Sequence, residues 1–568
     1  MPSLSLASGA ASPPLRPVTV LSRLLLPAAL LLGVALPAQA QDPTTDPRVP
    51  SLTPREFEIR GDVRVALPQI ERQPLSGFGP PPRTYVVPAD RAALTGAYDP
   101  DLDALPPLAL APPAEPEDNL PVARRLRLEG TYGAQAGRTT RFDVIAPVAS
   151  GQISADFDYE GVGWETDLED LAFDRLRGGV ALHTGGRLQF GLEASGVVDR
   201  YGMPAVRESQ NLAEMPLRRL TRLGGRASLT GVGSLPFDAA IRYSGDRLAP
   251  ASDGADAVLG PSQSAALVDA TLEATFADRL RIDAGAGTIG LDGGLGEDAQ
   301  YAAGGASLLL GSPGRFQLAL GARALGYRAG ASNGDGDATA IAPLVDLSFN
   351  AGPSLRLFAS NDPGLVVRGL GDLAETNPFV VDRPVIAPDL LRTNARVGVE
   401  LVSARLRLQG FAHYTDAPTW LVFDRAPDGR FFEGYEGVRI QGATARASIV
   451  AASGVSVEVG ATARQGEITE NGGEIPFFSP LTFRGGLQVP FARGRLGLTA
   501  YHETARPDSR GGFTEVDGFT LLSADARYDL TGSIALLLQA DRLAGTVEEW
   551  PGYALPGTTV RGGLRVTL

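Results

Sequence analysis

The sequence predicts an all-β fold, a transmembrane antiparallel β-barrel of about 22 strands, preceded by a signal peptide and a proline-rich N-terminal segment. Two patterns carry this prediction. Short segments alternate between apolar and polar side chains, and they are joined alternately by a tight turn and by a long polar loop. A water-soluble sheet can also alternate, but the regular change from tight turn to long loop is typical of barrels in an outer membrane.

The alternation is clearest in two segments of the chain. In 150–160, apolar residues such as Phe157 alternate with acidic residues such as Asp158, and 558–568 alternates apolar residues with arginine and threonine. Successive side chains of a strand point to opposite faces, so each segment has one apolar and one polar side. The apolar side suits contact with lipid, and the polar side then faces the barrel interior.

Residues 1–40 have the composition of a secretory signal peptide. Residues 1–23 contain arginine but no acid, residues 24–36 are apolar, and residues 38–40 (Ala-Gln-Ala) give a small-x-small cleavage site before Gln41. The apolar stretch is too short for a membrane-spanning helix. We therefore expect export, cleavage before Gln41 and location in the outer membrane of a Gram-negative bacterium.

The segment 41–121 is dominated by proline. It holds 17 of the 44 prolines, and proline removes the hydrogen-bond donors that a sheet needs. We expect an extended chain that either fills the lumen or forms a periplasmic arm. A barrel of this size needs a filled or constricted lumen, and the candidates are residues 41–121, the long loop 362–390 and a separate protein. The direct tether to the first strand favours residues 41–121.

From residue 122 to the C-terminus, the chain divides into the strands of the barrel. Tight turns rich in glycine and proline, such as 312–314, mark one end of the strands. Long polar connections, such as 200–218 and 362–390, mark the other end. The predicted parts are the signal peptide 1–40, the proline-rich segment 41–121 and the barrel 122–568.

Alternation also assigns strand residues to a face. The apolar residues predicted to face lipid include Phe157, Leu318, Leu320, Leu536, Leu538 and Val566. The polar residues predicted to line the lumen are Arg315, Gln317, Arg323, Glu400, Arg405, Arg407, Gln409 and His413. Such charges can select the solutes that pass or can pair with one another inside the barrel, and both interpretations stay open.

Composition limits the chemistry of the chain. A net charge of −14 argues against nucleic acid, and the absence of cysteine excludes disulfides and thiolate metal sites. His183, His413 and His502 are the only histidines, and no motif places a nucleophile or an acid beside one of them. Residues 333–337 (Asn-Gly-Asp-Gly-Asp) lack the other ligands of a calcium loop. We therefore predict no enzyme activity, no cofactor and no metal site.

Four segments near the C-terminus together resemble, in sequence and order, those of a known family. They are 434–442 (Gly-Tyr-Glu-Gly-Val-Arg-Ile-Gln-Gly), 516–521 (Val-Asp-Gly-Phe-Thr-Leu), the loop 541–557 and the closing strand 561–568. Together they resemble the barrel of TonB-dependent receptors, which implies uptake of a large solute such as a siderophore, cobalamin or a glycan. The plug and the transducer box of that family are not evident before the barrel, and Leu568 replaces the closing aromatic residue.

The predicted function is solute uptake across the outer membrane by a barrel similar to TonB-dependent receptors. Two alternatives stay open: a structural or assembly component of an outer-membrane complex, and a non-energised channel. The expected partners are outer-membrane lipid and lipopolysaccharide, the barrel assembly machinery, and a periplasmic or surface lipoprotein.

Overall fold

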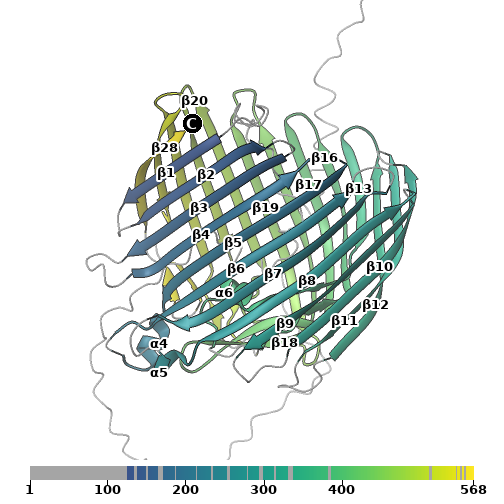
Figure 1. Cartoon of the computed structure of the whole chain (residues 1–568), viewed down its shortest axis with the longest axis horizontal. Coiled ribbons are helices and arrows are strands. Elements are labelled where there is room, and N and C mark those ends of the chain that lie inside the picture. The colour runs from purple at the N-terminus through teal and green to yellow at the C-terminus, as the bar shows by residue number, and fades with distance from the viewer. Residues whose placement is uncertain are drawn as a thin grey trace, which may run out of the picture. The chain divides into compact units, whose positions relative to one another are not determined.

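A computed structural model of the chain describes residues 125–568 with short gaps (Figure 1). The gaps are 134–136, 149–150, 164–170, 186, 213, 232–234, 252–255, 278, 293–297, 313–314, 330–336, 382–384, 511–513, 545–546, 551–552 and 556–557. The predicted signal peptide 1–40 and proline-rich segment 41–121 lie outside the described residues.

The described residues form a closed antiparallel β-barrel of 22 wall strands, which confirms the predicted fold class. The first strand pairs with the second and also with the last, so the sheet closes and no wall edge is left unpaired. The wall strands are β1 (Arg125–Gly133), β2 (Arg138–Val148), β3 (Gly151–Gly163), β4 (Leu171–Thr184), β5 (Leu188–Gly202), β6 (Leu217–Gly231), β7 (Phe237–Pro250), β8 (Gln263–Phe276), β9 (Leu280–Asp292), β10 (Ala299–Ser312), β11 (Phe316–Arg328), β12 (Asp337–Asn350), β13 (Leu355–Asn361), β16 (Thr393–Val402), β17 (Leu406–Arg425), β18 (Phe431–Val450), β19 (Ser456–Ile468), β20 (Leu481–Phe491), β21 (Gly494–Glu503), β24 (Phe519–Asp529), β25 (Ile534–Asp541) and β28 (Thr559–Thr567).

The two ends of the barrel differ as the sequence predicts. Tight turns gather at the end that carries the C-terminus, at the top of Figure 1. One of them contains Gly454, whose φ of +83° is readily adopted only by glycine. The opposite end, which we call the mouth, carries all the remaining elements: α4 (Pro204–Ser209), α5 (Asp256–Leu259), β14 (Gly364–Val366), α6 (Leu370–Thr376), β15 (Asp389–Leu391), the hairpin β22 (Arg506–Pro507) and β23 (Glu515–Val516), and the hairpin β26 (Val547–Trp550) and β27 (Tyr553–Leu555).

Among the described residues, no helix has the length and apolar character needed to cross a membrane.

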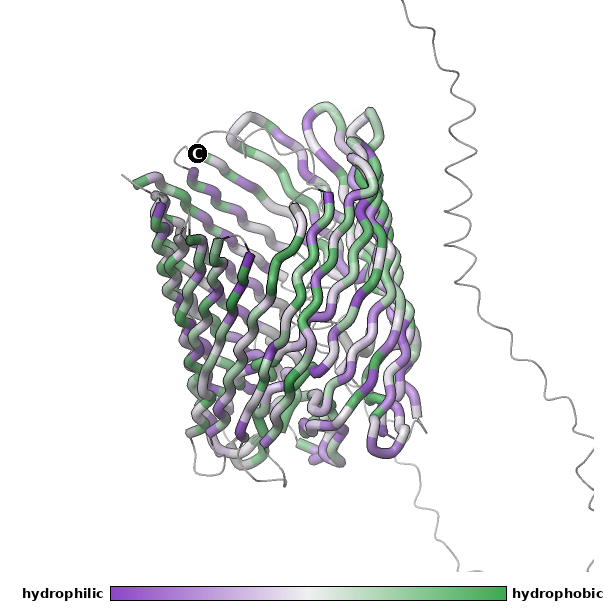
Figure 2. The backbone as a smooth tube through the Cα atoms, turned by 90° about the vertical axis from the view of Figure 1, so that its right-hand side faces the viewer, coloured by the Kyte–Doolittle hydropathy of each residue, from purple (hydrophilic) through white to green (hydrophobic). Residues whose placement is uncertain are grey.

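The outer surface of the wall is apolar over a broad band. Along the strands, hydrophobic and hydrophilic residues alternate (Figure 2). Leu320 and Leu536 are 45% and 44% exposed on the outer face. Leu318 is half-buried but belongs to the same face, because it lies two residues from Leu320 and pairs with the exposed Leu310. Phe157, Leu538 and Val566 occupy the same outer face of their strands, by the same alternation.

The buried apolar core lies at the mouth rather than along the whole barrel. Its residues come from the mouth ends of β5 to β11 on one side and of β17, β18 and β24 on the other. Between them lie α6 and the segment around Phe379, which are buried as well. The interior at the mouth is therefore packed with side chains of the chain itself.

Candidate functional site

The candidate site is the connection between β13 and β16, residues 362–392, which folds into the mouth. We call it the crossing loop; its described residues are 362–381 and 385–392. Leu370, Phe379, Val380 and Leu390 are all fully buried, although an outer loop would ordinarily be exposed. This loop was one of three candidates for filling the lumen, and at the mouth it does so.

The crossing loop reaches two walls that lie nearly opposite each other. Its helix α6 packs against β6 and β7, the sixth and seventh wall strands. Further along, Leu390 pairs with Thr419 of β17, and Val380 forms a bridge with Phe431 of β18, the sixteenth wall strand. In a ring of 22 strands, β6 and β18 are ten places apart. The loop therefore crosses the mouth instead of lining one side of it.

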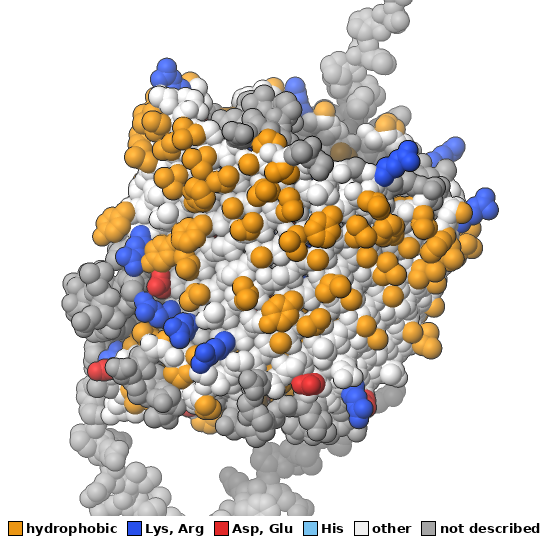
Figure 3. All heavy atoms as spheres, viewed as in Figure 1, with side chains coloured by type: hydrophobic (Ala, Val, Ile, Leu, Met, Phe, Trp, Pro, Cys, Tyr) orange, Lys and Arg blue, Asp and Glu red, His pale blue; other side chains and the backbone are white. Residues whose placement is uncertain are grey.

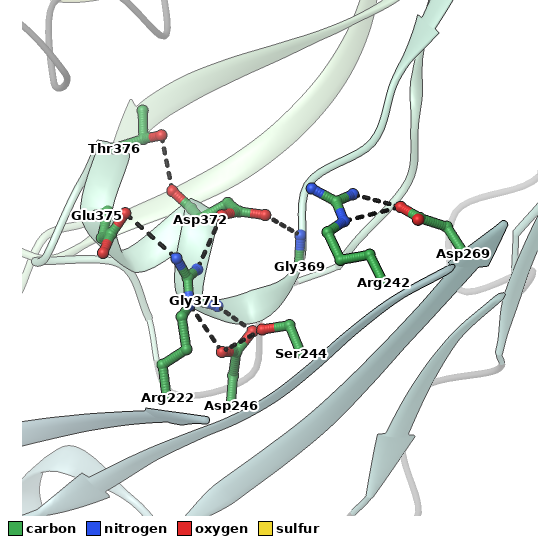
Figure 4. A network of polar contacts seen from close by, with 10 residues as sticks. All are labelled: Arg222, Arg242, Ser244, Asp246, Asp269, Gly369, Gly371, Asp372, Glu375 and Thr376. Carbon is green, nitrogen blue, oxygen red and sulfur yellow. Dashed lines mark hydrogen bonds and ion pairs between the residues drawn. The ribbon is translucent and has the colours of Figure 1, made fainter. Parts of the chain in front are cut away.

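Arg222 of β6 fastens α6 to the wall (Figure 4). Its Nε donates to Asp246 Oδ1 of β7 at 2.9 Å, and its Nη2 donates to Asp372 Oδ1 of α6 at 2.9 Å. Glu375, one turn further along α6, lies with Oε2 3.3 Å from Nη1. The second carboxylate oxygen of Asp246 accepts from Gly371 N at 2.8 Å. One guanidinium, 16% exposed, therefore joins β6 and β7 to two residues of α6, and Asp246 holds a third point of the crossing loop.

Arg323 of β11 holds the entry to the crossing loop. Its Nε donates to Asp283 Oδ2 of β9 at 2.9 Å. Its Nη1 donates to Asp362 Oδ1 and to the Pro363 carbonyl, both at 2.6 Å. Charge-assisted hydrogen bonds of this kind are stronger than neutral ones, so the entry is fixed to the wall as firmly as α6.

The exit of the crossing loop is fastened to β17 and β18. The fully buried Asp389 carboxylate accepts from Arg368 Nη1 and from Leu421 N of β17, the latter at 2.9 Å. Burial raises the pKa of Asp389, and these two donors oppose that rise by favouring the ionised form. Tyr435 of β18 accepts a hydrogen bond from Ala387 N at 2.9 Å.

Aromatic side chains complete the closure of the mouth. Phe379 of the crossing loop stacks on Tyr553 with ring centroids 3.5 Å apart, and Phe431 meets Trp550 edge-on at 5.0 Å. Such contacts add to the free energy of burial. The aromatic cluster, which is drawn from six separate segments, comprises Tyr201, Phe379, Phe423, Phe431, Phe477, Trp550 and Tyr553.

The structure places most of the predicted lumen residues on wall strands of the barrel. Arg407 donates to Glu400 across β16 and β17 at 2.8 Å, so these two charges pair with each other. Gln409 follows on the same face of β17 and is half-buried. His413 is buried, with its ring 6.1 Å from that of Phe411. A role of these residues in selecting a solute stays a prediction.

Three predicted lumen residues lie near the tight-turn end. Gln317 is exposed on β11, on the same face as Arg323. Arg315 and Arg405 lie in the turns before β11 and β17, where both are exposed. The strands begin at Phe316 and Leu406, one residue after these arginines, so the structure puts the two side chains at the rim of the barrel instead of on its wall.

Sequence reasoning missed Arg222, Asp246 and the aromatic cluster. Alternation assigns Arg222 to a face. It does not reveal the partners of Arg222 in α6, Asp372 and Glu375, which lie about 150 residues further along the chain. A signal for the crossing loop was present, however. The run Phe379-Val380-Val381 is apolar within a loop that would be exposed if it extended outward, and exposed loops are normally polar.

Within the described ranges, no group of three or more histidine, aspartate or glutamate side chains could hold a metal ion. The three histidines lie on β4, β17 and β21, and the nearest carboxylate oxygen to His183 is that of Glu193 at 3.8 Å.

The wall and mouth define a large β-barrel of the kind found in TonB-dependent receptors, and solved structures confirm that resemblance for the fold. The FrpB iron transporter from Neisseria meningitidis matches with a TM-score of 0.61 and 12% identity over 79% of this chain and 83% of that chain. The copper transporter OprC matches with a TM-score of 0.57 and 13% identity over 78% and 80% of the two chains. The ferric yersiniabactin uptake receptor FyuA from Yersinia pestis matches with a TM-score of 0.55 and 13% identity, again over 78% and 80%. No model of a protein family and no curated protein matches the sequence.

Proposed function

We propose that the protein takes up a solute across the outer membrane of a Gram-negative bacterium, and that the crossing loop is the gate of its mouth. The observation that carries the proposal is the attachment of the crossing loop to opposite walls of a 22-strand barrel. Barrels with this number of strands are wide enough to need a filled lumen. In this proposal, the signal peptide 1–40 directs export and is cleaved before Gln41.

The attachments suit a gate more than a permanent seal. The loop belongs to the same chain as the wall and is held by side-chain ion pairs and ring contacts, without a covalent link. A solute that binds the open mouth better than the closed mouth would shift the equilibrium towards opening. A purely structural or assembly role has no need of a mouth that opens, and a non-energised channel would open without a solute.

The cargoes of the structural neighbours suggest which solutes to test first. Their names give iron, copper and ferric yersiniabactin as cargo. We therefore propose metal ions and their chelates as the first class of solute. Growth on a ferric chelate as sole iron source, compared between a deletion strain and its complemented strain, tests this class. Equal growth of the two strains on every metal source would reject it.

Replacement of Arg222 tests the gate directly. In Arg222→Ala, Asp246 loses its cationic partner, and Asp372 and Glu375 are released from the wall. The Arg222–Asp246 pair joins two wall strands, so its loss weakens the open and the closed mouth alike. Loss of the contacts to the partly exposed Asp372 and Glu375, each worth about 1 kcal/mol or less, weakens the closed mouth alone. Arg222→Ala is made in a chain without residues 42–115, so that the mouth alone obstructs flow. We expect it to show larger and more frequent openings in planar bilayers than the same chain with Arg222, and to sensitise cells to large antibiotics.

Arg242→Ala is the matched control. Arg242 lies on the neighbouring strand β7 and pairs with Asp269 of the wall rather than with the crossing loop (Figure 4). Made in the same shortened chain, this variant should stay as closed as the shortened chain with Arg242. If Arg222→Ala and Arg242→Ala both stayed closed, or both opened to the same extent, the crossing loop would not be the gate.

A further inference from the structure

Three arginines lie together on the outer face of the barrel near the mouth. They are Arg200 of β5, Arg219 of β6 and Arg247 of β7, and we call them the outer arginine patch. They belong to the outer face because they continue the rows of exposed Val198, Leu223 and Tyr243 on the same strands. Figure 3 shows basic side chains gathered in this part of the surface, at the lower left.

The charges of this patch are poorly compensated. Arg200 and Arg219 are direct cross-strand partners, an arrangement that is destabilising for like charges. Arg200 has one acidic partner, Asp174, at 3.3 Å. Arg219 forms no ion pair with any described residue, and Arg247 donates only to Ser262 at 3.4 Å.

The inner face of the same strands shows the opposite arrangement. Arg175 pairs with Asp199, Arg222 with Asp246, and Arg242 with Asp269. Each of these three inward arginines has an acid directly opposite on an adjacent strand. Among the described residues, the outer arginine patch has three guanidinium groups and one acidic partner, Asp174, so it can accept an anion from outside the chain.

The position of the patch identifies the kind of anion. Each of the three arginines comes directly beyond the apolar part of its strand, on the mouth side. In a membrane, this is the level at which hydrocarbon gives way to headgroups. Guanidinium groups bind phosphate in a bidentate manner, and the apolar face beside them can hold acyl chains.

We propose that the outer arginine patch binds the phosphate groups of a lipid A-type glycolipid, that is, lipopolysaccharide of the outer leaflet. The proposal rests on the outer-membrane location given above, with the mouth facing outward. It is independent of the gate, because the three arginines lie on the outer face, whereas the crossing loop is attached to inward side chains such as Arg222. A free phosphate would use the guanidinium groups alone, whereas lipid A uses the apolar face as well.

Native mass spectrometry of the purified full-length protein tests the proposal. The wild type is compared with the triple variant Arg200→Gln, Arg219→Gln and Arg247→Gln. The control variant carries Arg187→Gln, Arg279→Gln and Arg493→Gln, which make the same charge change in the tight turns at the opposite end. Heat-dependent mobility on gels shows whether each barrel is folded.

We expect the patch variant to retain about tenfold less added lipopolysaccharide than the wild type and the control variant. Lipid A without phosphates should bind the wild type as weakly as intact lipopolysaccharide binds the patch variant. Equal retention by all three proteins would overturn the proposal and leave a protein partner as the occupant. If inorganic phosphate at micromolar concentration displaced bound lipopolysaccharide, the natural ligand of the patch would be free phosphate, and the proposal of a lipid would be wrong.

Discussion

At the scale of single residues, the pleat of each strand decides whether a side chain meets the interior or the surroundings. Adjacent residues of one strand therefore have opposite requirements. On β11, Leu318 lies on the outer face, whereas its neighbour Gln317 shares the inner face with Arg323. The sequence alone predicts these faces, because the alternation of polarity is visible without any structure.

Arginine substitutions at Leu318 and Gln317 test which of the two residues faces lipid. We expect Leu318→Arg to destabilise the assembled barrel by about 1–2 kcal/mol, since it would bring a charge into hydrocarbon near the tight-turn end, where the cost is lower than at the midplane. Gln317→Arg adds the same charge to the inner face, which tolerates it. Urea-dependent unfolding in lipid vesicles measures both variants. Equal stability of the two would show that the assignment of faces is wrong.

The partner of a charged residue could not be predicted in the same way. Arg323 and Arg407 were both predicted to line the lumen. Arg407 pairs with Glu400 on the adjacent strand, which a hairpin makes plausible from the sequence. Arg323 instead binds Asp283, which lies two strands away across Gly305 of β10, and Asp362, which the folding of the loop brings to it.

At the scale of elements, the crossing loop differs from the other mouth connections in its length and in its contacts with opposite walls. Its apolar residues are buried because the mouth offers an apolar surface from β5 to β11 and from β17 to β18. A strand pattern gives no information about such a surface, since each strand contributes only one or two residues to it. This part of the site therefore had to come from the structure.

Phe379→Ala should loosen the crossing loop. The substitution removes the ring that stacks on Tyr553 and leaves a cavity in the aromatic cluster, at a cost of roughly 3–5 kcal/mol. Faster hydrogen exchange in residues 364–381 is the expected result. Phe432→Ala provides the control, because Phe432 is exposed and does not belong to the cluster. Unchanged exchange in Phe379→Ala would contradict a role of the cluster in holding the loop.

At the scale of the whole molecule, strand number and polarity were predictable because every wall strand repeats one pattern. The boundaries of the closing strand were close, since it was predicted at 558–568 and is observed at Thr559–Thr567. Other boundaries were less close at the mouth. There β18 already begins at Phe431, ahead of the segment 434–442, because its first residues pair with β17 and hold the crossing loop.

Deletion variants can show which segments of the chain obstruct the pore of the barrel. The crossing loop closes the mouth, and residues 41–121 are predicted to fill the lumen further along. If both segments block the same pore one after the other, removing one of them still leaves the pore blocked by the other. A loop variant is feasible, since Asn361 and Ala395 are cross-strand partners and a short Gly-Ser linker can replace residues 364–391.

We compare the wild type, the loop variant, a variant without residues 42–115, and the combination of both in planar bilayers. If residues 41–121 fill the lumen, each single variant should conduct weakly, and the combination should conduct more than the sum of the two. Sensitivity of cells to large antibiotics should follow the same order. If the loop variant alone conducts as much as the combination, residues 41–121 do not obstruct the lumen. The proline-rich segment would then be a periplasmic arm, and a structural or assembly role would gain support over uptake.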